Sequence, residues 1–389
     1  MKTSLNPTGY KMKSVLIQKA NARIWSAKLT SPFRIAKGQH DLIENVLFAI
    51  ELSNGTRGFG EAAVATHITG ETVLETLKHL KEASRWVLGR DLADFPEIAE
   101  YFKGLFSMNK CALAALEMAL LDAATRVKKI PLWRAFGPRL RTLRTDMTVV
   151  LGNVFEAEAA TKDILRRGIR SFKVKIGRDF DKDLKRVMAI ARIAKRCPIY
   201  LDANQGFTAV QTLKFLKELT RLKVRPVLVE QPVEKGDWEG LTQVTRESKV
   251  LVCADESVGS LADAKRMIKT KAAGAINVKF AKTGMLEAYE IARLAKRNGI
   301  KLMIGTMMET PLAVTAAAHF AAGLGGVDFV DLDAPFFMAE SVTRGNYVTR
   351  SGLYDLRKVR AGIGVVPSEV SVNTRRLTSG SRDLTPGIV

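Results

Sequence analysis

From about residue 145 onward, the chain alternates short apolar runs with longer amphipathic stretches. The apolar runs predict buried β-strands, and the stretches between them carry apolar residues at helical spacing. Several of these helices are expected to end at a glycine, namely Gly168, Gly299 and Gly323. The predicted strands are Asp146–Val150, Ser171–Lys175, Ile199–Asp202, Val227–Glu230, Val250–Ala254, Ala275–Lys279, Lys301–Gly305 and Phe329–Asp333.

Eight strands that alternate with helices at this regular spacing favour an α/β fold of the TIM (β/α)-barrel type. An open doubly wound sheet is the alternative, because it uses the same alternation of strands and helices. That fold would place a glycine-rich GxGxxG turn after one strand, and no such turn follows any of the eight. We therefore expect a barrel over residues 137–344.

The first part of the chain follows a different pattern. Two apolar-rich runs, Val15–Leu29 and Ile43–Leu52, precede the hairpin signal Asn54-Gly55 and a third strand at Arg57–Glu61. Helices are expected at 70–89, 94–106, 109–127 and 131–136, and strands followed by helices indicate an α+β domain. The segment Pro32–His40 between the first two strands is predicted to be a loop and a candidate lid.

The predicted domain division has four parts. Residues 13–136 form the α+β capping domain, and residues 137–344 form the barrel. Residues 1–12 are a polar, disordered lead-in. Residues 345–389 return to the capping domain, and their end, from Arg375 onward, is expected to be disordered.

The composition narrows the class of protein. The formal net charge is +21, but the basic residues are spread along the chain without a long block, which argues against a nucleic-acid partner. No signal peptide or membrane-spanning stretch is evident, so we expect a cytoplasmic protein with no membrane partner. The cysteines Cys111, Cys197 and Cys253 have no metal spacing and fit a reducing compartment.

Two lysines lie on one face of the second predicted barrel strand. Side chains alternate along a strand, so Lys173 and Lys175 share a side, opposite Phe172 and Val174. Mutual repulsion and burial both favour the neutral amine, and we expect the pKa of each lysine to fall, as a general base requires. A solvated edge strand is the alternative for an isolated pair of this kind.

Three carboxylates follow at the ends of the next three strands, at Asp202, Glu230 and Asp255. Parallel barrel strands bring their carboxyl ends together, so these side chains are expected to converge. Such a group needs a cation, and oxygen ligands favour Mg²⁺, one ion per subunit. Each carboxylate alone could instead be a helix cap or a surface ion pair.

A further lysine, Lys279, ends the sixth strand, across the barrel mouth from Lys175. A substrate carboxylate held at the metal would place its α-carbon between two amines. One amine could remove the α-proton from one face and the other could return it to the opposite face. The sequence thus predicts a 1,1-proton transfer through an enediolate that the metal stabilises.

These residues resemble the enolase superfamily, in the branch of the muconate lactonizing enzymes. The likeness covers nearly the whole chain and implies a modified barrel with a capping domain that the C-terminal segment completes. It also implies that Lys175 and Lys279 are the acid/base pair and that Lys173 tunes the pKa of Lys175. Its motifs are the Lys-x-Lys strand, Asp202-Ala203-Asn204, Glu230-Gln231-Pro232, Ala254-Asp255-Glu256-Ser257 and the sixth-strand lysine.

Within that branch the sequence is similar to the dipeptide epimerases. Asp331 and Asp333 match the acids that hold the free ammonium of a dipeptide there, and two carboxylates suit a cationic ligand. The resemblance further implies the support residues Asn204 and Glu256 around the metal. The remaining substrate-binding candidates are Thr148, Thr306, Met308 and, in the lid, Arg34 and Lys37.

The lead hypothesis is therefore epimerisation at the α-carbon of the C-terminal residue of an L-Ala-Xaa dipeptide, with L-Ala-D/L-Glu as the first candidate substrate. The resemblance further implies a homo-oligomer. An epimerase of hydrophobic dipeptides is one alternative. A cycloisomerase, an o-succinylbenzoate synthase or an N-acylamino acid racemase on the same scaffold is another. A non-catalytic basic binding protein is the alternative from a different class.

Overall fold

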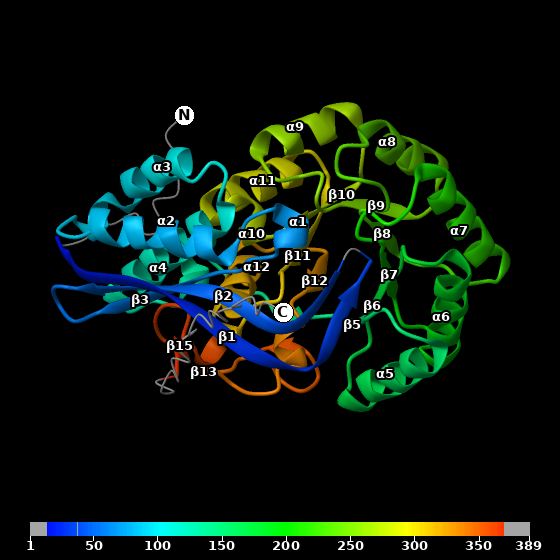
Figure 1. The fold of residues 1–389 in the computed structure, drawn as a ribbon, viewed down its shortest axis with the longest axis horizontal. Coiled ribbons are helices and arrows are strands. Elements are labelled where there is room, and N and C mark those ends of the chain that lie inside the picture. Colours follow the sequence, from blue (N-terminus) through cyan, green and yellow to red (C-terminus); the bar gives the residue numbers. More distant parts are fainter. Residues whose placement is uncertain (1–13, 37, 369–389) are drawn as a thin grey trace, which may run out of the picture.

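Eight short parallel strands form the barrel, and their order in the sheet is their order in the chain (Figure 1). The backbone N–H of Asp146 donates to the carbonyl of Val330 at 2.9 Å and links the two edge strands. The predicted barrel is thereby confirmed, and every strand end lies within two residues of its predicted position. The strands are β5 (Met147–Val149), β6 (Phe172–Lys175), β7 (Ile199–Asp202), β8 (Leu228–Glu230), β9 (Leu251–Ala254), β10 (Ala275–Val278), β11 (Lys301–Gly305) and β12 (Phe329–Asp331).

The computed structural model describes residues 14–36 and 38–368. The lead-in at 1–12, Lys37 and the segment from Arg375 onward lie outside the described residues. Among the described residues, no helix is both long and apolar enough to cross a membrane.

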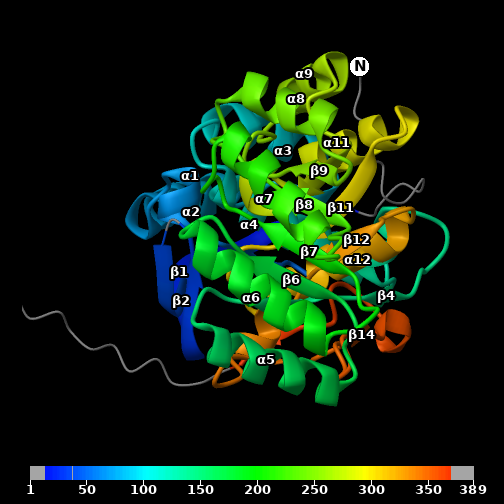
Figure 2. The same cartoon turned by 90° about the vertical axis from the view of Figure 1, so that its right-hand side faces the viewer.

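Helices cover the outside of the barrel, as Figure 2 shows for the amphipathic helices α5 to α8, whereas α10 and α12 are buried along nearly their whole length. Their starts are fixed by side-chain caps, such as the capping box between Asn153 and Glu156, and Gly168 ends α5 with a φ of 92°. The helices are α5 (Val154–Arg167), α6 (Phe180–Ile193), α7 (Ala209–Arg221), α8 (Trp238–Glu247), α9 (Leu261–Thr270), α10 (Phe280–Thr283), α11 (Met285–Arg297) and α12 (Pro311–Leu324).

The capping unit is a three-stranded antiparallel sheet packed on helices. Gly58 and Gly60 let its third strand lie directly on a helix, because a Cβ on Gly60 would lie 1.9 Å from the carbonyl oxygen of Ala115. Its elements are β1 (Ile17–Ile35), β2 (Gly38–Leu52), β3 (Arg57–Ala62), α1 (Thr66–Thr69), α2 (Val73–Trp86), η1 (Leu92–Asp94), α3 (Phe95–Leu105), α4 (Lys110–Val127) and η2 (Leu132–Ala135).

The prediction of a loop at 32–40 is wrong. Strands β1 and β2 continue through this segment as a hairpin, in which Phe33 pairs with His40 and Ile35 with Gly38. A shift in strand register between Lys28 and Phe33 accommodates Pro32. The tip reaches the barrel, where the N–H of Leu151 donates to Arg34 O at 3.1 Å. Residues 32–40 extend as a hairpin because they contact a barrel that is distant in sequence, and local sequence patterns do not report such a contact.

Two buried polar side chains fasten the capping sheet to the loop after β11. Glu61 on β3 accepts from the N–H of Thr310 at 3.0 Å and from its hydroxyl at 2.6 Å. Asn45 on β2 donates to Glu61 at 2.7 Å and to Met308 O at 3.0 Å. The segment that carries Met308 is therefore positioned from the capping side as well as from its own strand.

The C-terminal segment packs back across both parts. Within it, β13 (Thr343–Arg344) pairs with β15 (Val366–Pro367), and β14 (Leu353–Tyr354) pairs with β4 (Leu143–Arg144). Gly362 donates to Ile130 O at 2.9 Å and accepts from Leu132 N at 2.8 Å, which ties the segment to the capping unit. Two short 3₁₀ turns complete the fold, η3 (Ala334–Phe337) and η4 (Leu356–Lys358).

His319 on α12 is a fully buried packing residue. Its Nδ1 accepts from the N–H of Trp133 at 3.1 Å, and its Nε2 lies 3.0 Å from Ile363 O, so the ring is neutral with its proton on Nε2. Burial lowers the pKa of His319 from 6.5 to about 4. The ring therefore joins α12, η2 and the C-terminal segment only while it is uncharged.

The neutral His319 predicts a specific loss of stability in acid. In the unfolded chain His319 takes up a proton at its ordinary pKa of 6.5, whereas in the folded chain it does so only at about 4. The neutral ring therefore contributes its whole free energy of unfolding above pH 6.5, and this contribution is lost as the pH falls from 6.5 toward 4. Between neutral pH and about pH 4.5, the wild type should lose free energy of unfolding through this histidine, and His319→Gln should not. We expect the loss in the variant to be smaller than that in the wild type by about 2.5 kcal/mol. Urea unfolding at both pH values measures this, and equal losses in the two proteins would contradict it.

Candidate active site

The ionisable residues of the site lie at the carboxyl ends of the barrel strands. Strand register places Lys175 beside Asp202 and Asp202 beside Glu230. Lys173 and Lys175 share one face of β6, as predicted, and both contact Asp202. Both lysines are buried, with Lys173 only 1% exposed, so the alternative of a solvated edge strand is wrong.

Lys173 is surrounded by carboxylates. Its Nζ lies 2.6 Å from Asp331 Oδ2, 2.8 Å from Glu230 Oε2 and 3.0 Å from Asp202 Oδ2. Burial opposes the charge of Lys173, but these carboxylates outweigh burial and hold its pKa well above the ordinary value. The prediction of a lowered pKa for Lys173 is therefore wrong, because it counted burial and the neighbouring lysine but not the acids that other strands bring to the same place.

Lys175 has a different environment. Its Nζ donates to Asp202 Oδ2 at 2.7 Å and to Asn204 Oδ1 at 3.1 Å. Asn204 follows β7 with a φ of 42°, and its N–H donates to Asp202 Oδ1 at 2.9 Å. This turn holds the amide and the carboxylate together, so the two residues fix the position of the Lys175 amine from one side.

Lys279 enters the site from the end of β10, opposite Lys175. Its Nζ donates to Asp255 Oδ2 at 2.7 Å. Burial opposes its charge, but Asp255 outweighs burial, and the pKa of Lys279 is raised. A second buried lysine, Lys282, donates to Asp255 Oδ1 at 2.6 Å and to Asn277 O at 3.0 Å. Sequence reasoning gave Lys282 no role, although its spacing of three residues from Lys279 places both on one helical turn.

Asp202, Glu230 and Asp255 are fully buried side chains that offer only oxygen atoms. Glu230 Oε1 accepts from Asn277 Nδ2 at 2.7 Å, and Oε2 lies 2.8 Å from Lys173 Nζ. Burial and the charge of Asp202 raise the pKa of Glu230 to about 8. The lysines nearby therefore do not fully offset the negative charge of the three acids, and a donor set of buried carboxylate oxygens fits a hard divalent cation.

Glu256 lies beside this group. Its Oε2 is buried and accepts no hydrogen bond from a described residue. Burial and the charge of Asp255 raise the pKa of Glu256 to about 7. Its position next to Asp255 adds to the surplus of negative charge at this end of the barrel.

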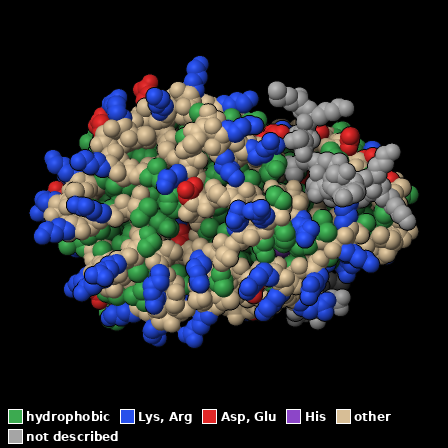
Figure 3. Space-filling model, turned by 180° about the vertical axis from the view of Figure 1, so that it is seen from behind, with side chains coloured by type: hydrophobic (Ala, Val, Ile, Leu, Met, Phe, Trp, Pro, Cys, Tyr) green, Lys and Arg blue, Asp and Glu red, His purple; other side chains and the backbone are tan. Residues whose placement is uncertain are grey.

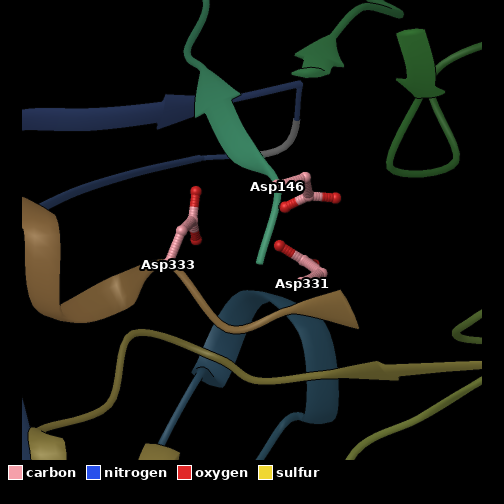
Figure 4. A group of neighbouring side chains, drawn as sticks. All are labelled: Asp146, Asp331 and Asp333. Carbon is pink, nitrogen blue, oxygen red and sulfur yellow. The ribbon is translucent and has the colours of Figure 1, made fainter. Parts of the chain in front are cut away.

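A second acidic group lies where β12 meets β5 (Figure 4). Asp146, Asp331 and Asp333 each bring one carboxylate oxygen within 4.8 Å of the others, and the side chains of Asp146 and Asp331 point toward one another. Burial and the charge of Asp331 raise the pKa of Asp333 to about 6, although its Oδ2 accepts from the N–H of Thr148 at 2.6 Å. The arrangement suits a cation, either an ammonium group or a metal ion. Asp146 was not singled out from the sequence, because it begins its predicted strand and only residues at the carboxyl ends of the strands were considered.

A small cavity lies between the lysines and the second acidic group. Its open volume is about 50 Å³, little more than the share of one water molecule. The capping unit lines it mainly with apolar side chains: Phe33, Ile35, His40, Ala65 and Ile68. The barrel contributes Thr148, Lys173, Lys175, Asn204, Lys279, Thr306, Met307, Met308, Asp331, Asp333 and Ala334.

The predicted lysines, Asn204 and the barrel substrate-binding candidates line this cavity, whereas the predicted metal ligands Asp202, Glu230 and Asp255 and their neighbour Glu256 do not. Asp202 and Asp255 instead contact the lysines that do line it. Arg34 does not line the cavity, and its Nε donates to Gln39 at 3.2 Å on the outside of the hairpin. The other lid candidate, Lys37, lies outside the described residues. The sequence did not predict the hairpin residues that line the cavity, Phe33, Ile35 and His40. It predicted a loop at this segment, and a loop does not place alternate side chains on one face.

Comparison with known proteins gives the same picture of the whole chain. Residues 156–371 match the enolase C-terminal domain-like family model, and residues 19–137 match that of the mandelate racemase/muconate lactonizing enzyme N-terminal domain. A hydrophobic dipeptide epimerase from Citrifermentans bemidjiense is 50% identical over 91% of this chain and 98% of its own length.

Solved structures show the same relationship. A substrate-liganded L-Ala-D/L-Glu epimerase from Bacillus subtilis has a TM-score of 0.88 at 30% identity, over 91% of this chain and 100% of that one. A dipeptide epimerase from Enterococcus faecalis, complexed with Mg and the dipeptide L-Leu-L-Tyr, has a TM-score of 0.86 at 30% identity, over 90% and 99%. The chain belongs to the mandelate racemase/muconate lactonizing enzyme family of the enolase superfamily.

Proposed function

We propose that this protein is a Mg²⁺-dependent dipeptide epimerase that inverts the α-carbon of the C-terminal residue of dipeptides with apolar side chains. The observation that carries the proposal is the placement of Lys175 and Lys279. They enter one cavity from β6 and from the end of β10, which lie four strands apart in a barrel of eight. A substrate between them meets one amine on each face.

The two lysines perform the proton transfer. The neutral amine of one lysine takes the α-proton, and the ammonium group of the other donates a proton to the opposite face. Asn204 and Asp202 hold the Lys175 amine, and Asp255 holds that of Lys279. Because the two amines face one carbon, either stereoisomer of the substrate can be the starting point.

Asp202, Glu230 and Asp255 are the residues that would hold Mg²⁺. When bound, the ion supplies positive charge for the negative charge that develops on the substrate carboxylate. Lys173, which already contacts Asp202 and Glu230, adds a fixed positive charge at the same place. Glu256, next to Asp255, would add a further carboxylate beside these ligands without being one of them.

The second acidic group is proposed to bind the other end of the substrate. Asp331 and Asp333 line the cavity and would accept hydrogen bonds from the free α-ammonium group of the dipeptide. The N–H of Thr148 orients Asp333 for this contact. This arrangement favours a dipeptide over substrates without an amine, such as those of a cycloisomerase or an o-succinylbenzoate synthase.

The side chains that the capping unit places over the cavity, called the lid here, favour a substrate with an apolar side chain over one with glutamate. Phe33, Ile35 and Ile68 face the cavity, and the cations that line it among the described residues are barrel lysines, not lid residues. An unpaired carboxylate would lose hydration against such a lid. The relative that is 50% identical is described as a hydrophobic dipeptide epimerase, which agrees with this preference.

Several expectations accompany the proposal and rest on the sequence. These are the division into a capping unit at 13–136, a barrel at 137–344 and a returning segment at 345–389, a cytoplasmic location, a homo-oligomeric state and the lack of a nucleic-acid partner. The lysines and arginines in Figure 3 are scattered over the whole visible face rather than gathered in one patch, which supports the last of these.

Incubation with a dipeptide library in D₂O tests the function. We expect deuterium at the α-carbon of the C-terminal residue with Mg²⁺, and loss of that signal with EDTA that Mg²⁺ restores. Mass spectrometry of the products measures both. If no free-amine dipeptide gained deuterium under either condition, the epimerase proposal would fail.

Lys279→Ala is expected to lower kcat/KM for epimerisation by about 10²- to 10⁴-fold, because one face loses its proton donor. Exchange of the α-proton should persist from the stereoisomer whose proton faces Lys175. Lys301→Ala is the matched control, because Lys301 is exposed at the start of β11, and it should leave the rate unchanged. Near wild-type epimerisation by Lys279→Ala would contradict a two-base mechanism.

The lid predicts the order of substrates. We expect kcat/KM for L-Ala-L-Leu to exceed that for L-Ala-L-Glu by about 100-fold, because the cavity offers apolar contacts and no lid cation. Ile68→Arg should reduce that ratio about tenfold, while Ile68→Gln, which adds polarity without charge, should change it much less. A wild-type preference for L-Ala-L-Glu would overturn the apolar assignment and leave the epimerase function standing.

A further inference from the structure

A second and much larger cavity lies on the capping unit, away from the barrel mouth. Its open volume is about 480 Å³, within the range of small-molecule sites. It forms where the outer face of the three-stranded sheet meets the C-terminal segment. The residues around it are Asn21, Arg23, Leu47, Ala49, Gly55, Thr56, Arg57, Phe59, Arg126, Arg344, Ala361, Val366, Pro367 and Ser368.

Four arginines surround this cavity and no acidic residue lines it. Arg126 is held by Asp122 at 2.8 Å and by Val365 O at 3.3 Å, so its position is fixed. Among the described residues, Arg23, Arg57 and Arg344 have no ion-pair partner within 4.0 Å. Burial lowers the pKa of Arg23, which means that its charge is held at a cost that a bound anion would relieve.

The acids near the cavity do not neutralise the group, because Asp122 is paired with Arg126 alone among the described residues. Glu51 on β2 lies close enough to Arg57 to interact with it electrostatically, but its carboxylate is paired with Lys19 at 2.7 Å. The positive charge around the cavity is therefore not balanced within the described part of the chain. Three guanidinium groups at one cavity supply more N–H donors than a single carboxylate can accept. A phosphate group presents three oxygens and up to two negative charges, so it suits this group of arginines better.

The floor of the cavity is apolar. Leu47, Ala49 and Phe59 lie next to one another across β2 and β3 and are nearly fully buried. The guanidinium carbons of Arg57 and Arg126 lie 5.1 and 5.7 Å from the centre of the Phe59 ring. Such a floor contacts the body of an organic molecule while the rim contacts its anionic groups.

We propose that this cavity is a binding site for a small organic molecule that carries phosphate groups. It is separate from the epimerase site, because Leu47 lies seven residues along β2 from His40, roughly 23 Å at the usual rise of a strand. The two sites share the β1–β2 hairpin, whose base lines the arginine cavity and whose tip lines the active site.

Isothermal titration calorimetry of the full chain tests the proposal, with ATP, pyrophosphate and citrate at constant ionic strength in buffer without Mg²⁺. We expect saturable binding of ATP at one site per chain, tighter than that of pyrophosphate because ATP also contacts the apolar floor. Citrate, which carries carboxylates only, should bind at least about tenfold more weakly than ATP.

Arg57→Ala/Arg344→Ala is the test variant, because both side chains are exposed and their loss should leave the fold intact. We expect it to weaken ATP binding by at least about tenfold. Arg225→Ala/Arg350→Ala removes the same charge from exposed positions outside the cavity and should change binding less than about twofold.

Four results would overturn the proposal. The first is the lack of saturable ATP binding by the wild type. The second is equal weakening by the control variant, which would indicate a general effect of net charge. The third is unchanged binding by the cavity variant, and the fourth is citrate binding as tight as that of ATP.

Discussion

Buried charge at the carboxyl ends of the barrel strands is the constraint on which the rest of this structure depends. Charged groups are costly to bury unless each has a partner, and here lysines and carboxylates from different strands supply those partners. Lys173 alone contacts acids from β7, β8 and the end of β12. A slip of one strand by a single residue would turn its charged side chain to the other face, so strand register and site geometry are fixed together.

The acids of this site outnumber its bases. Seven buried carboxyl groups surround the barrel mouth, and four buried lysines face them. The carboxyl groups are those of Asp146, Asp202, Glu230, Asp255, Glu256, Asp331 and Asp333, and the lysines are Lys173, Lys175, Lys279 and Lys282. Burial, together with this surplus of negative charge, raises the pKa values of Glu230, Glu256 and Asp333, and the surplus is consistent with the divalent cation and the ammonium group of the proposed function.

The capping unit contributes shape rather than charge. Glu61 and Asn45 fasten its sheet to the loop after β11, and the β1–β2 hairpin lays apolar side chains over the lysines. A charged floor under an apolar lid would separate the two tasks of the proposed site, with the floor for the common backbone of a dipeptide and the lid for its side chains. Exclusion of water by the lid also strengthens the electrostatic contacts below it.

The sequence by itself determined the eight barrel strands, because strand periodicity is a local pattern, and it indicated the catalytic candidates at their ends through the convergence expected of a barrel and a family resemblance. It did not determine the hairpin at 32–40 or the orientation of Arg34, which depend on contacts with a barrel distant in sequence. It also missed the raised pKa of Lys173 and the role of Lys282. Only the tertiary structure decided these, because the charge state of a buried group is set by neighbours that folding brings from other strands.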